Sequence, residues 1–73
     1  MRIFKPYPVL RESLVNLKSG IVFRGVIWKD SRGFLILRNA LLIQDQNRQK
    51  ADPRAVDGEI LIYKSEVDFL QLL

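Results

Sequence analysis

The chain has 73 residues, no cysteine and no histidine, and a formal net charge of +4. Without cysteine neither a disulfide nor a thiolate metal site can form, and without histidine the commonest zinc ligand and the commonest general base are missing. Hydrophobic residues make up 48% of the chain, which is enough for the core of one small domain. Because so short a domain buries only about 60% of the surface that its unfolded chain exposes, oligomerisation is the remaining common source of extra stability.

The positive charge is concentrated in the first half of the chain. Residues 1–38 carry eight basic and two acidic side chains, whereas residues 39–73 carry four basic and six acidic ones. A basic segment attracts phosphate groups, although any small soluble domain also needs surface charge. No apolar run approaches the roughly 18 residues of a membrane-spanning helix and no secretory pattern follows Met1, so we expect a cytoplasmic protein with no membrane partner.

The first 13 residues are predicted to form an extended arm or a single helical turn. Pro6 and Pro8 prevent a regular helix at the start, and Val9–Ser13 could form one turn after Pro8. The rest of the chain favours β structure, because β-branched, aromatic and leucine side chains fill short runs that end at turn residues. The predicted strands span residues 14–18, 21–29, 34–43, 59–63 and 67–72.

Glycine and aspartate mark the predicted turns and one bend. Gly20 ends a turn between the first two strands, and Asp30 and Gly33 begin and end a hairpin turn in which Asp30 would accept hydrogen bonds from backbone N–H groups. Gly25 lies in the middle of a strand, which indicates a bend or a close approach of another strand. Residues 44–58 are polar and are predicted to form a variable loop.

Both faces of predicted strands 21–29 and 34–43 are apolar, whereas a sheet with one wet face alternates apolar and polar residues. Two-sided burial is typical of a small, strongly bent, five-stranded antiparallel barrel of the SH3-like class, or of a face covered by another subunit. Trp28 is accordingly expected in the core or in a subunit interface. The predicted faces of the second of these strands are Leu35, Leu37 and Leu41 on one side and Phe34, Ile36 and Leu42 on the other.

Two stretches of this pattern resemble the motifs of the Sm/LSm/Hfq family. Residues 14–40 are similar to the first Sm motif, and residues 60–70 to the second, where Tyr63-Lys64 is similar to the bacterial Hfq branch. The first motif is matched by Gly20, Phe23, Gly25, Ile27, Asp30 and Leu35–Leu37. The resemblance implies one Sm-like domain over residues 1–73, in which the exposed edges of the last two strands pair between identical subunits and close a ring. Small Sm-like proteins of tailed bacteriophages are similar to its opening arm and its closing segment.

The resemblance also implies where nucleic acid would bind. In the geometry of the family, the turn around Arg32 and the turn around Lys64 line the central pore of the ring. Arg32, Lys64 and Ser31 would contact single-stranded RNA there, with Tyr63 and Phe34 as stacking rings. Arg32 stands at the family's base-stacking position, and Ser65 replaces the Hfq histidine. These residues could equally be solvated turn residues or, for the aromatic pair, core or interface residues.

Other basic residues leave two interpretations open. Arg24, Lys29 and Arg38 could form an electropositive face or cover apolar surface with their alkyl stems, and a basic arm with Arg2, Lys5 and Arg11 could bind nucleic acid or a neighbouring subunit. No enzymatic activity, cofactor or metal is expected, because no histidine can activate Ser13, Ser19, Ser31 or Ser65. The alternative function is a structural or adaptor ring, for example one encoded by a phage, with no role in nucleic-acid binding.

Overall fold

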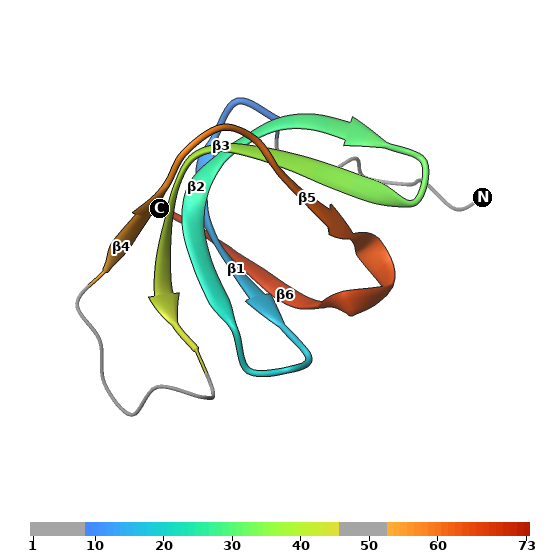
Figure 1. Ribbon diagram of the computed structural model, residues 1–73. Helices are drawn as coiled ribbons and strands as arrows, with labels where there is room; N and C mark the ends of the chain where they lie inside the picture. The colour runs from blue at the N-terminus through green and yellow to red at the C-terminus, as the bar shows by residue number, and fades with distance from the viewer. Residues whose placement is uncertain (1–8, 46–52) are drawn as a thin grey trace.

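The computed structural model describes residues 9–45 and 53–73, and these form one antiparallel sheet of six strands (Figure 1). The strands are β1 (Glu12–Leu17), β2 (Val22–Ser31), β3 (Phe34–Gln44), β4 (Arg54–Val56), β5 (Ile60–Tyr63) and β6 (Val67–Leu72). A single turn of 3-10 helix, η1 (Lys64–Glu66), joins β5 to β6. The prediction of a small, mainly β, antiparallel protein is confirmed. Within the described ranges, no helix is long and apolar enough to cross a membrane.

The long strand β3 organises the sheet, because two short strands share one of its edges. The strand order is β4-β3-β2-β1-β6, and β5 pairs with β3 beside β4. β5 lies against Phe34–Leu37 at the start of β3, and β4 lies against Ala40–Leu42 further along it. In the part of the chain that the structure describes, β5 pairs only with β3 and β6 only with β1, so each has one free edge.

The predicted five-stranded barrel is wrong in two respects. The first is β4, an additional strand inside the range 44–58 that was expected to be a loop; it forms because residues 54–56 reach the edge of β3 beyond β5. The second is closure: among the described residues β5 and β6 do not pair, since η1 turns the chain from the edge of β3 to the edge of β1. The helical turn predicted at Val9–Ser13 is also absent, because Leu10 has a φ of 67° and Glu12 already begins β1.

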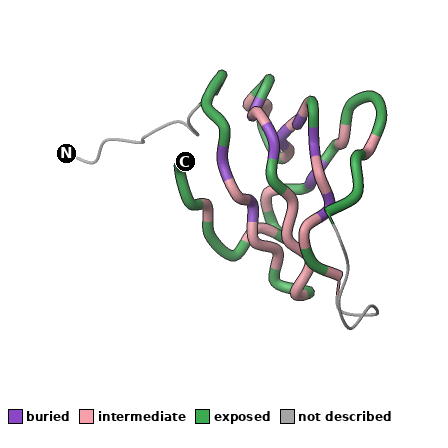
Figure 2. Tube along the Cα trace, turned by 90° about the vertical axis from the view of Figure 1, so that its left-hand side faces the viewer, coloured by how far each residue is buried: buried purple, intermediate pink, exposed green. Residues whose placement is uncertain are grey.

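The core lies on the inner, concave side of the curled sheet. Its buried residues, purple in Figure 2, belong to β1, β2, β3 and β5. They are Val15, Ile27, Leu35, Leu37, Ala40, Leu42 and Ile62. Leu17, Phe23, Ile60, Val67 and Leu70 pack against this cluster from its borders. Trp28 is not among the core residues, since it is 43% exposed; of the two places expected for it, the core is excluded and a subunit interface stays a prediction.

Gly25 allows β2 to bend sharply over β3. The pairing of β2 with β3 shifts register between Arg24 and Val26, which is the bend that the sequence predicted. A Cβ atom at Gly25 would lie only 3.1 Å from the Cα of Ala40 and from the carbonyl oxygen of Arg38. Glycine is therefore required here for close approach of the two backbones.

Asn39 changes which side chains of β3 face the core. Its φ of 54° is left-handed, a conformation that asparagine tolerates better than most residues. Past this residue Ala40 and Leu42 are buried, whereas uninterrupted alternation from Leu37 would have buried Leu41. The predicted faces of β3 are therefore correct before Asn39 and wrong after it.

Candidate functional site

The five residues predicted to bind nucleic acid lie together at one end of the sheet, where the β2–β3 hairpin meets the corner between β5 and η1. Two cross-strand pairs and one hydrogen bond hold the two segments together: Ser31 lies opposite Phe34, Phe34 lies opposite Tyr63, and the Lys64 N–H donates to the carbonyl oxygen of Gly33 at 2.9 Å. We call this group the tip cluster. It consists of Ser31, Arg32, Phe34, Tyr63 and Lys64.

Lys64 is held by a carboxylate. Its ammonium group forms an ion pair with Asp30, and the two side chains are only 27% and 16% exposed. Asp30 lies opposite the fully buried Leu35 and therefore faces the inner side of the sheet. The prediction that Asp30 is a turn residue is wrong, because Asp30 belongs to β2 and its carboxylate joins β2 to η1. This pair compensates the charge that Lys64 was expected to offer to a phosphate.

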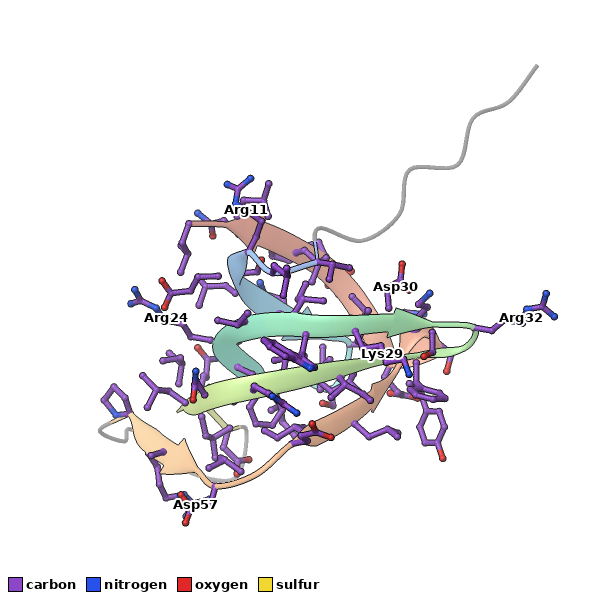
Figure 3. All side chains as sticks on the ribbon, turned by 90° about the horizontal axis from the view of Figure 1, so that it is seen from above. Arg11, Arg24, Lys29, Asp30, Arg32 and Asp57 are labelled. Carbon is purple, nitrogen blue, oxygen red and sulfur yellow. The ribbon has the colours of Figure 1, made fainter. Side chains whose placement is uncertain are left out.

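Arg32 occupies the tip of the hairpin and extends away from the sheet (Figure 3). The turn is one residue later than predicted, since Ser31 and Phe34 already form a pair and only Arg32 and Gly33 connect them. Gly33 has a φ of 88°, so the turn uses the freedom of glycine as expected. The same holds for Gly20, whose φ is 98° and whose N–H donates to the carbonyl oxygen of Leu17 at 2.9 Å. No ion pair among the described residues involves Arg32, so its guanidinium is available to an anion.

The aromatic members of the tip cluster lie on the opposite side of the sheet from Asp30. Phe34 and Tyr63 form a direct cross-strand pair on the outer face. Tyr63 is 63% exposed and Phe34 is half-buried. A ring that is exposed to this extent can stack against a planar group without any rearrangement of the fold. The tip cluster thus presents aromatic rings on the outer face and a compensated ion pair on the inner one.

Two of the basic residues expected on the strands are also compensated. Arg24 binds Glu12 with an Nε–Oε2 distance of 2.9 Å, and Arg38 binds Glu59 through Nε at 2.8 Å and Nη2 at 2.6 Å. Both pairs are exposed, where such bridges contribute about 0.2–1 kcal/mol. Lys29 takes part in no ion pair among residues 9–45 and 53–73.

The remaining basic residues belong to the N-terminal segment. Arg2 and Lys5 lie outside the described residues. Arg11 is exposed, and the backbone around it is tied to β2, because the Ile27 N–H donates to the Arg11 carbonyl oxygen at 3.2 Å and the Leu10 N–H donates to the Ile27 carbonyl oxygen at 2.6 Å. No group of three or more acidic side chains in the described ranges could hold a metal ion.

Sequence reasoning missed the contact between Trp28 and Arg38. The guanidinium carbon of Arg38 lies 4.1 Å from the centre of the Trp28 ring, which is a cation–π contact. An aromatic and a basic residue on adjacent predicted strands indicate such a contact only when the register between the two strands is known. A bulge at Trp28 shifts the register between β2 and β3, so the sequence alone could not predict this contact.

No protein-family model matches the chain, and no curated protein matches it.

Proposed function

We propose that the protein is an Sm-like subunit that forms a closed ring of identical copies and binds single-stranded nucleic acid, RNA in particular, at the tip cluster. The observation that carries this proposal is the convergence of two turns that are distant in sequence. They bring together the rings of Phe34 and Tyr63 and the cation of Arg32, which forms no ion pair with any other described residue. Exposed aromatic rings beside an uncompensated arginine are the elements with which proteins hold single strands.

The free edges of β5 and β6 support assembly into a ring. An exposed strand edge offers backbone N–H and C=O groups to another chain. β6 lies at one end of the strand order, and β5 lies at the opposite side of the sheet, on the edge of β3 beside β4. Both strands carry exposed apolar side chains on or near these edges, namely Leu61 at 51% and Phe69 at 54% exposure. Pairing of β5 of one copy with β6 of the next is head-to-tail, and such an interface closes into a ring when its rotation closes.

Within such a ring, every subunit contributes one tip cluster. Arg32 is the residue on which phosphate binding depends, because Asp30 compensates Lys64. A charge-assisted contact to each of several phosphates would make affinity fall steeply with salt.

Native mass spectrometry of the full chain tests the ring. We expect one closed oligomer for the wild type and a shift to monomer for Leu61→Lys, which places a charge at the β5 edge. Ser19→Lys adds the same charge in the exposed β1–β2 turn and should leave the oligomer intact. A monomeric wild type, or an oligomer that is insensitive to Leu61→Lys, would overturn the ring.

Fluorescence anisotropy with a labelled uridine-rich 12-nucleotide RNA tests binding. Arg32→Ala should weaken binding about tenfold or more and reduce the slope of log affinity against log salt, by about 0.7 for each phosphate that the variant no longer binds. Arg54→Ala is the matched control, since Arg54 is an exposed arginine on β4, which pairs with the other end of β3. An intact ring that binds no oligonucleotide would overturn the nucleic-acid function and leave the structural ring.

A further inference from the structure

A bulge in β2 places two consecutive residues, Trp28 and Lys29, on the outside of the protein. Ile27 pairs with Leu37 and Lys29 pairs with Ile36, so Trp28 has no partner of its own on β3. Ile27 is completely buried while Trp28, the only tryptophan in the chain, is nearly half exposed. Full burial of so large a ring would stabilise the fold, and an exposed ring that belongs to a larger apolar surface is typical of a binding site.

Arg38 and Glu59 hold the position of this ring. Arg38 stacks on Trp28 with its guanidinium 4.1 Å from the ring centre, and Glu59 fixes the guanidinium through two of its nitrogens. The arginine therefore restrains the indole, and its own charge is already compensated. A ring that is restrained before binding loses little conformational freedom when a ligand stacks on it.

Trp28 belongs to a continuous outer surface that reaches the tip cluster. Register pairs place Lys29 beside Ile36, Ile36 beside Leu61, and Phe34 beside Tyr63, all on the side away from the core. We call this surface the tip face, and it consists of Trp28, Lys29, Phe34, Ile36, Leu61 and Tyr63. The labelled Lys29 and Arg32 lie at the hairpin end of this surface in Figure 3.

The charges around the tip face favour a polyanion. The carboxylate beside it, Glu59, is bound to Arg38, whereas Lys29 and Arg32 take part in no ion pair in the part of the chain that the structure describes. A second copy docked face to face on this surface would bring these like charges against each other, which disfavours face-to-face association; the proposed ring pairs through the edges of β5 and β6 instead. Aromatic rings interleaved with free cations suit a chain of stacked bases and phosphates.

We infer that the tip face is a base-stacking surface for single-stranded nucleic acid, with Trp28 as a stacking ring outside the pore-side turns; this inference rests on the proposed function. The emission of the single tryptophan reports on it directly. Titration of the wild-type protein with unlabelled uridine-rich and adenine-rich 12-nucleotide RNA should quench Trp28 emission, and inorganic polyphosphate, which has charge but no bases, should not.

Two substitutions complete the test by anisotropy of the labelled RNA. Trp28→Leu should weaken binding about fivefold or more because a stacking ring is removed, and Trp28→Phe should restore most of the affinity because it keeps a ring. Thermal unfolding of both variants checks that they fold. RNA that binds and responds to Arg32→Ala, but leaves Trp28 emission and the affinity of Trp28→Leu unchanged, would overturn this inference alone. Equal quenching by polyphosphate, or loss of the oligomer in Trp28→Leu, would also overturn this inference. Absence of any RNA binding would overturn both this inference and the proposed nucleic-acid function.

Discussion

Replacing Gly25 by alanine tests whether the bend of β2 depends on close contact with β3. The added Cβ would lie 3.1 Å from two backbone atoms of β3 and 3.3 Å from the Cβ of Ala40. Backbone atoms cannot rotate away, so the strands must move apart, and overpacking of this kind costs about 1–3 kcal/mol. Gly→Ala at an unstrained site gains about 0.4–1 kcal/mol through the unfolded chain. We therefore expect the free energy of unfolding to fall by about 1–2 kcal/mol.

Urea unfolding followed by circular dichroism, at one fixed protein concentration, measures this change. Thermal unfolding gives a second readout, because in a domain of this size a loss of about 1 kcal/mol lowers Tm by roughly 4–8 °C. Adding Ala40→Gly to the Gly25→Ala variant removes one of the three close approaches and should recover part of the loss, after subtraction of the cost of Ala40→Gly alone. A Gly25→Ala variant as stable as the wild type, or more stable, would refute the reasoning, because that is the behaviour of a glycine that contributes only flexibility.

Three further predictions use the same unfolding measurement. Lys64→Met removes one partner of the mostly buried pair with Asp30 and should lower the free energy of unfolding by about 1–3 kcal/mol. The double variant Lys64→Met/Asp30→Asn should lose less stability than the two single variants lose in sum. Strict additivity would mean that the pair does not interact. Asn39→Val should destabilise by about 1–2 kcal/mol because a β-branched residue resists positive φ, and Asn39→Gly should not; equal stability of these two variants would contradict this explanation. Glu59→Gln breaks an exposed pair and should cost less than about 1 kcal/mol, so a larger loss would show that this pair supports the core.

The structure changes which residues carry the candidate site. The sequence places Arg32 and Lys64 in equivalent roles, one in each turn, but Asp30 compensates only Lys64. Arg32 and Lys29 take part in no ion pair among the described residues, and both lie at the hairpin end of the outer face. We therefore propose that the candidate site extends from the turns toward Trp28.

Strands and turns could be predicted from the sequence because they depend on neighbouring residues. The five expected strands recur with small shifts of their ends, and Gly20 and Gly33 take the positive φ that their turns require. The bend at Gly25 follows from a glycine inside an apolar strand. In each case, backbone preference and the alternation of apolar side chains act over a few residues, and no distant contact is needed.

Only the tertiary structure decided which side chains face the core and which charges are compensated. The bulge at Trp28 and the left-handed Asn39 each shift the alternation by one residue, and both depend on how β2 and β3 align over their whole length. The pair between Asp30 and Lys64 joins two segments 34 positions apart in the sequence, and it forms because β5 docks on β3. Local propensity carries no information on such alignments, since they are set by contacts between strands that meet only when the sheet has formed.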